Sequence, residues 1–147
     1  MDDILSAEQL SQRIIADSND AMMFADRQGV IRLWNRGAEK MFGYSEPEAL
    51  GQSLDLIIPE NLRNRHWEGY YRVMESGESH YNVDLLSAPA LRKDGTRIST
   101  EFSMVLVKGD DGKVLGVAAV IRDVSVRWQR EKELKERIRV LEAQQAG

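Results

Sequence analysis

The sequence contains no cysteine and no long apolar run. The lack of cysteine excludes disulfides, thiolate metal sites, cysteine nucleophiles and chromophores attached through sulfur. No apolar segment approaches the roughly 20 residues that a membrane-spanning helix requires, and the acidic start of the chain is unlike the basic start of a secretory signal. The net charge of −4 comes from a mixture of both signs, which argues against a nucleic-acid binder. We therefore expect a cytoplasmic protein that contacts neither membrane nor nucleic acid.

The apolar content is sufficient for one domain, because 42% of the 147 residues are hydrophobic. Periodicity, capping residues and turn motifs divide the chain into helical and extended segments. The predicted helices cover residues 6–17, 36–42 and 60–75, and the predicted strands cover 21–25, 30–34, 81–91, 98–106 and 114–121. Pro89 interrupts the third of these strands, which predicts an edge position or a bulge. The order indicates an α+β architecture, in which a five-stranded antiparallel sheet has helices on one face and a pocket between the layers.

The C-terminal segment is rich in Arg, Glu, Lys and Gln and has a heptad pattern. Its a and d positions hold Val124, Glu131, Leu134, Ile138 and Leu141. This pattern predicts a helix that pairs with a copy of itself and makes the protein a homodimer. The alternative is a single helix that packs on its own sheet. The expected divisions are an N-terminal flanking helix (1–17), a central domain (18–124) and a C-terminal coiled-coil helix (125–147).

Three motifs resemble those of one known family. They are the run from Asn35 to Tyr44 (NRGAEKMFGY), the turn Arg92–Gly95 (RKDG) and the segment Ile121–Ser125 (IRDVS). Together they make residues 10–125 similar to a PAS domain of the S-box type, and the C-terminal helix resembles the signalling helix that leaves such domains. The resemblance implies the PAS fold and a sensory role in bacterial-type signal transduction, with a downstream signalling protein or effector domain as partner. It leaves the ligand open, because PAS domains bind haem, flavin, small metabolites or nothing.

His66 is the strongest candidate for a cofactor ligand. On the predicted helix, Leu62, His66, Tyr70 and Val73 fall at i, i+4, i+8 and i+11, so they share one face, which we expect to point at the sheet. Gly69 lies on the same face. A glycine inside a helix costs about 1 kcal/mol relative to alanine, so it indicates a packing reason, such as room for a flat macrocycle. A neutral imidazole in an apolar pocket suits haem iron, and the pattern therefore favours haem b bound through His66.

The segment around His66 also resembles the haem-binding PAS domain of FixL-type oxygen sensors. An ungapped comparison implies that His66 is the proximal iron ligand. It also implies that Arg72 and His80 hold the haem propionates, a role that suits basic side chains. These two histidines are the only ones in the sequence.

The opposite side of this pocket is predicted to be apolar. Leu86 stands where the FixL-type sensors have the arginine that binds oxygen, and Met104 lies on the inward face of its strand with Phe102 and Leu106. Bound O2 would lack a hydrogen-bond donor there, whereas CO and NO depend less on one. The resemblance thus implies sensing of a diatomic gas or of redox state. The Met104 thioether is a second candidate iron ligand.

Each of these residues also has a purely structural interpretation. His66 suits a hydrogen-bonded core histidine, Met104 suits a filler of core gaps, and Arg72 and His80 suit solvated surface positions. Two other functions stay open: a cofactor-free PAS module for dimerisation or protein interaction, and a PAS pocket for a small metabolite or flavin. The sequence has no recognisable catalytic triad, phosphate-binding glycine loop or spacing of metal ligands, so we do not expect an enzyme.

Overall fold

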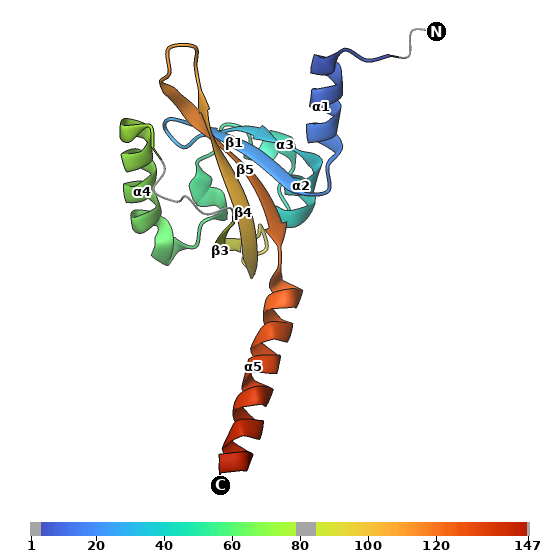
Figure 1. Cartoon of the computed structure of the whole chain (residues 1–147). Helices are drawn as coiled ribbons and strands as arrows, with labels where there is room; N and C mark the ends of the chain where they lie inside the picture. Colours follow the sequence, from blue (N-terminus) through green and yellow to red (C-terminus); the bar gives the residue numbers. More distant parts are fainter. Residues whose placement is uncertain (1–3, 79–84, 147) are drawn as a thin grey trace.

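The computed structural model describes residues 4–78 and 85–146, and its centre is an antiparallel sheet (Figure 1). Five strands lie in the order β2-β1-β5-β4-β3, with every neighbouring pair antiparallel. The strands are β1 (Ala21–Asp26), β2 (Ile31–Trp34), β3 (Leu86–Leu91), β4 (Arg97–Lys108) and β5 (Val114–Asp123). The predicted five-stranded antiparallel sheet is confirmed, and its last strand in sequence, β5, lies at the centre.

The short helices between β2 and β3 lie together on one face of the sheet (Figure 1). They are α2 (Arg36–Phe42), α3 (Glu46–Ala49), the 3-10 turns η1 (Leu54–Ile57) and η2 (Glu60–Leu62), and α4 (Arg63–Ser76). The helix predicted from residue 60 therefore starts as a 3-10 turn. Its first turn is closed by an i to i+3 bond from the Leu62 N–H to the Pro59 carbonyl, and α-helical geometry begins at Arg63.

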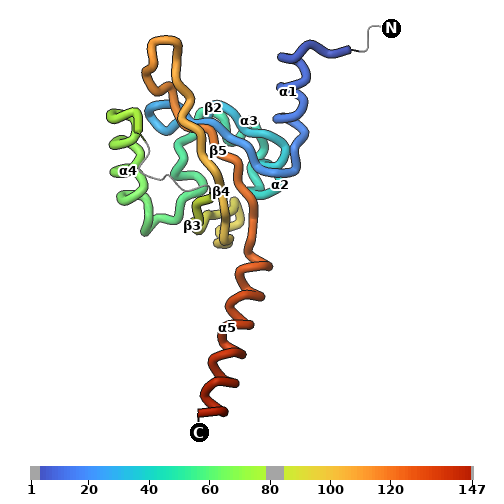
Figure 2. The backbone as a smooth tube through the Cα atoms, viewed as in Figure 1, coloured from blue at the N-terminus to red at the C-terminus, as the bar shows by residue number. Residues whose placement is uncertain are grey.

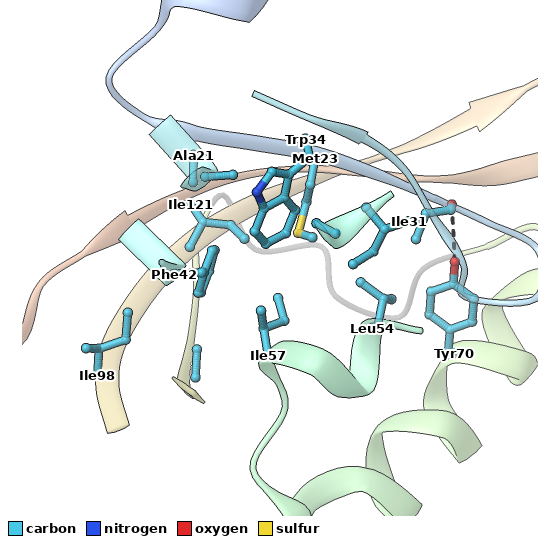
Figure 3. Packing of buried hydrophobic residues seen from close by; sticks show 14 of the residues in the cluster. Ala21, Met23, Ile31, Trp34, Phe42, Leu54, Ile57, Tyr70, Ile98 and Ile121 are labelled. Atoms are coloured by element: carbon cyan, nitrogen blue, oxygen red, sulfur yellow. Dashed lines mark hydrogen bonds between the residues drawn. The ribbon is translucent and has the colours of Figure 1, made fainter. Parts of the chain in front are cut away.

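The hydrophobic core lies between these helices and the inner face of the sheet (Figure 3). Trp34, Phe42 and Ile31 are its largest fully buried side chains. The register of the strands shows which residues face inward. Met104 on β4 pairs with Ala119 on β5, and Ala119 pairs with Met23 on β1, which is buried. Directly paired residues point to the same side of a sheet, so all three side chains lie on its inner face. The inner face of the sheet therefore packs against the helices through one apolar layer, as the α+β prediction requires.

Asn35 links three segments to this core through its buried side chain. Its Oδ1 accepts from the Met22 and Ala38 N–H groups, and its Nδ2 donates to the carbonyls of Ile15 and Asp20 at 2.7 and 3.0 Å. The same amide therefore caps α2, holds the first residues of β1 and fixes the end of the N-terminal helix α1 (Ala7–Asp17).

Strand β3 is an edge strand, as Pro89 predicts. Pro89 pairs with Ser99 in an uninterrupted register, so no bulge forms there. The predicted strand starts at residue 81, but the described strand starts at Leu86, and residues 81–84 lie outside the described part of the chain.

The C-terminal helix α5 (Ser125–Ala146) extends away from the domain (Figure 2). None of its described residues is buried, so the helix does not pack along its own sheet. None of the helices in residues 4–78 and 85–146 is both long and apolar enough to span a bilayer.

Candidate functional site

Tyr70 fastens α4 to the end of β1. Its hydroxyl donates to the backbone carbonyls of Ala25, at 3.3 Å, and Asp26, and its side chain is buried (Figure 3). Burial, with smaller contributions from the Asp26 and Tyr71 side chains, raises the pKa of the Tyr70 phenol above its usual value. The phenol therefore stays protonated and keeps its role as donor. The sequence predicted Tyr70 as a cofactor contact, but its hydroxyl is already hydrogen-bonded to the backbone.

Trp67 attaches α4 to two further segments, η1 and the turn between β1 and β2. Its Nε1 donates to Asp55 Oδ1 at 2.7 Å, and its ring covers Gly29, where an added Cβ atom would come within 2.1 Å of the indole. Gly29 also has a φ of 76°, so the turn and the contact with Trp67 both require glycine. Arg63 adds a hydrogen bond from its Nε to the Ile58 carbonyl at 3.1 Å.

His66 lies beside these anchoring residues on α4. Its ring centroid is 4.8 Å from that of Trp67 and 5.7 Å from that of Tyr70. Its Nδ1 is fully buried and has no hydrogen-bond partner among the described residues. Burial lowers the pKa of His66 below its usual 6.5, and the nearby Asp55 carboxylate only partly opposes this effect. The imidazole is therefore neutral at neutral pH and has a buried nitrogen available to a ligand.

The predicted apolar residues of the sheet lie on one face, as their alternation indicates. Leu86 on β3 pairs with Phe102 on β4, and Phe102 and Leu106 pack against the hydrophobic core. Met104 lies on the same face between them but is 38% exposed, whereas Ile98 and Thr100 farther along that face are buried. The inner face of β4 thus has incompletely covered apolar surface around Met104.

The remaining predicted contacts are not gathered around His66. An added Cβ at Gly69 would meet nothing within 4 Å, so protein packing gives no reason for this glycine and the space beside it is open. Arg72 is exposed and lies about 120° around the helix from His66. His80 lies outside the described residues.

A cavity of about 630 Å3 opens at the C-terminal end of α4, next to the turn between β4 and β5. Met74, Gly77 and Val114 contribute to its lining, together with the charged residues Arg27 and Lys113. His66 is not part of this lining, so the cavity is distinct from the predicted haem position.

Asp55 is a site residue that the sequence did not indicate. It accepts the Trp67 indole hydrogen bond and is the charged group that acts on the pKa of His66. It lies on η1, in a stretch whose short 3-10 turns have no clear periodicity. Only the Ser53 side chain, which accepts from the Asp55 N–H as a cap, gives a local signal for this turn.

Comparison with known proteins agrees with this arrangement of strands and helices. The profile of the PAS fold family matches residues 9–124. The chain belongs to the PAS family. Among solved structures, a PAS domain from Colwellia psychrerythraea superposes with a TM-score of 0.69 at 23% identity, covering 82% of this chain and 98% of that one. An RNA-binding light-oxygen-voltage receptor gives a TM-score of 0.73 at 19% identity, covering 92% of this chain and 40% of that one, which supports the fold alone.

Two curated relatives are sensor proteins. The oxygen sensor protein DosP of Escherichia coli is 30% identical over 125 residues, which is 85% of this chain and 14% of DosP. The sensor protein FixL of Bradyrhizobium diazoefficiens is 30% identical over 118 residues, 80% of this chain and 23% of FixL. This PAS chain therefore spans less than a quarter of either relative. It is a PAS sensory domain of the kind found in signal-transduction proteins.

Proposed function

We propose that this PAS domain binds haem b through His66 and reports a diatomic gas or a change of redox state through a dimeric C-terminal helix. The observation that carries the proposal is the His66 imidazole, whose Nδ1 is buried without a partner among the described residues. An unpaired buried polar atom costs about 1 to 3 kcal/mol, and a bound ligand would remove that cost. The name of DosP, an oxygen sensor protein, supports the same function.

The residues around His66 fit a haem group. The imidazole is neutral because burial lowers its pKa, and a neutral imidazole is the form that ligates iron. Open space beside Gly69 leaves room next to the helix, and Leu86, Phe102 and the partly exposed Met104 would cover the group from the sheet. When bound, haem supplies an iron that takes diatomic ligands and changes its redox state.

The protein environment favours CO or NO over O2 in this proposal. Leu86 and Met104 carry no hydrogen-bond donor, so a polar bound O2 would lack stabilisation from them. Met104 has a thioether that is a weak ligand, which makes it the second candidate for an iron ligand. Arg72 and His80 are proposed to hold the propionates, since both carry basic side chains.

The proposed output is a change in the pairing of α5. Leu134, Ile138 and Leu141 are each more than half exposed in the single chain, although they occupy a and d positions of the heptad pattern. Exposed apolar residues in this spacing favour a partner helix over an isolated one, and a second copy of the chain supplies an identical seam. The wider protein, including its effector, is proposed to receive the signal through this helix.

Absorption spectroscopy of the purified protein titrated with hemin tests the haem proposal. We expect a sharp Soret band at one haem per chain, and its loss or displacement in His66→Ala. Added imidazole is expected to restore the band, because it can replace the missing side chain. His80→Ala is the matched control: it removes the other imidazole and is expected to weaken binding without moving the band.

The other outcomes decide against haem bound through His66. A flavin spectrum in the purified protein would favour a flavin pocket. A protein that stays colourless after hemin titration would favour a cofactor-free interaction module. A Soret band that is unchanged in His66→Ala would show that haem binds without this ligand.

A further inference from the structure

Asp55 on η1, Trp67 on α4 and Gly29 in the turn between β1 and β2 are joined by a closed set of contacts. Asp55 Oδ1 accepts from Trp67 Nε1 at 2.7 Å, and the Trp67 ring covers Gly29 so closely that it leaves no room for a Cβ atom there. The set is closed by the Leu54 N–H, which precedes Asp55 and donates to the Gly29 carbonyl at 3.0 Å. Each of the three segments is therefore held by the other two.

The backbone of Asp55 is itself held in place. Ser53 Oγ accepts from the Asp55 N–H at 3.1 Å, and Arg63 donates from Nη2 to the Asp55 carbonyl at 3.2 Å. Both polar groups of the Asp55 main chain are thus bonded, and its carboxylate receives the indole N–H of Trp67. A hydrogen bond to an ionised acceptor is stronger than one between neutral groups, so this bond suits the role of an anchor.

The His66 imidazole contacts two rings that are fixed in this way. The planes of His66 and Trp67 meet at 75° with their centroids 4.8 Å apart, which is an edge-to-face contact. The Tyr70 ring lies 5.7 Å from the imidazole, and the Tyr70 hydroxyl is bonded to the carbonyls of Ala25 and Asp26. Ring contacts therefore orient His66, because its Nδ1 has no hydrogen-bond partner among the described residues.

We propose that Asp55 is a positioning residue for the proposed iron ligand, and that through Trp67 it holds the His66 imidazole in one orientation before haem binds. A ligand that is already oriented loses less conformational freedom on binding, so the groups that orient it strengthen metal binding. Asp55 acts only through Trp67 and does not itself bind iron. This inference rests on the proposed function, since it concerns the support of the ligand in the same site.

Nuclear magnetic resonance of the haem-free chain tests the orientation of the imidazole. Asp55→Ala removes the acceptor of the indole N–H, and the His66 ring signals are expected to shift and broaden as the ring samples several rotamers. Asp55→Asn keeps an oxygen acceptor and should keep the signals close to those of the natural chain. Ser45→Ala is the control for lost stability, because it removes the side-chain cap of the separate helix α3, and it should leave the His66 signals unmoved.

Hemin titration measures how much this orientation contributes to binding. Asp55→Ala and Trp67→Phe are each expected to bind haem about tenfold more weakly than the natural chain, the lower end of the effect of residues that orient a metal ligand. Combining the two substitutions should weaken binding no further, because both break the same hydrogen bond. Asp55→Asn should bind within about threefold of the natural chain, since its amide oxygen still accepts. The iron–histidine stretching frequency should move in Asp55→Ala and not in Ser45→Ala.

The outcomes separate this inference from the proposed function. If the natural chain binds no haem, the proposed function is wrong, and the His66 signals of the haem-free variants alone decide whether Asp55 orients the imidazole. If the natural chain binds haem through His66 and Asp55→Ala changes neither the affinity nor the His66 signals, only the inference is wrong. Ser45→Ala binding as weakly as Asp55→Ala would also overturn it, because the loss would then follow from stability and not from orientation.

Discussion

The buried side chain of Asn35 connects three segments of the chain, α1, β1 and α2. Its amide satisfies the Met22 and Ala38 N–H groups and two carbonyls from the chain before β1. Asn35→Ala leaves these buried groups unpaired and is expected to lower the free energy of unfolding by about 3 kcal/mol or more. Urea unfolding followed by circular dichroism measures this loss. Asn64→Ala, at an exposed position on α4, is the control and should change stability little; equal losses would contradict the role of the buried amide.

His66 gives the unliganded protein a pH dependence of known sign. Burial lowers its pKa in the folded chain below 6.5, so the unfolded chain takes up the proton more readily. The contribution to the free energy of unfolding is therefore complete above pH 6.5 and is lost as the pH falls toward the folded-state pKa. Unfolding measured between pH 8 and pH 5 should show a steeper loss in the natural chain than in His66→Gln. Both proteins keep His80, and identical pH profiles would argue against a buried neutral imidazole.

Helix α4 shows which part of a site can be predicted from spacing. The recurrence of Leu62, His66 and Tyr70 predicted the helix and its partly buried face, because these features depend on residues within a few turns of one another. The anchoring of Tyr70 on the Ala25 and Asp26 carbonyls could not be predicted, because it depends on how segments 44 and 45 residues apart meet in the fold. The 3-10 start of the helix and the role of η1 escaped prediction for the same reason.

The attachment of α4 to β1 predicts a difference between two neighbouring tyrosines. Tyr70→Phe removes the hydroxyl that donates to Ala25 and Asp26, and is expected to destabilise the domain by about 1 to 2 kcal/mol. Tyr71→Phe removes a hydroxyl from a side chain that is 51% exposed and should have almost no effect. Thermal and urea unfolding compare the two, and hydrogen exchange should show faster opening of α4 only in Tyr70→Phe. Equal stability of both variants would rule out the Tyr70 anchor.

The molecule consists of a packed domain and two helices, α1 and α5, that project from it (Figure 1). The motifs predicted the PAS domain because its turns and caps are local in sequence, and the structure places their strands in the expected sheet. The same local information left two alternatives for the C-terminal helix, pairing with a copy or packing on its own sheet. The exposed course of α5 rules out the second in the single chain.

The stability of the exposed helix α5 should depend on protein concentration. Alone, the 22-residue α5 has no buried side chain, and helices in proteins draw most of their stability from packing rather than from helix propensity. Pairing with a second copy would stabilise α5 by mass action, while the domain core stays independent of concentration. Far-ultraviolet circular dichroism should therefore show an early helical transition whose midpoint falls by roughly 5 °C on about a hundredfold dilution. Leu134→Ala combined with Leu141→Ala removes two residues that are 58% and 52% exposed in the monomer. It should abolish the concentration dependence and leave the transition of the core unchanged, and a transition of the natural chain that does not move on dilution would contradict pairing through α5.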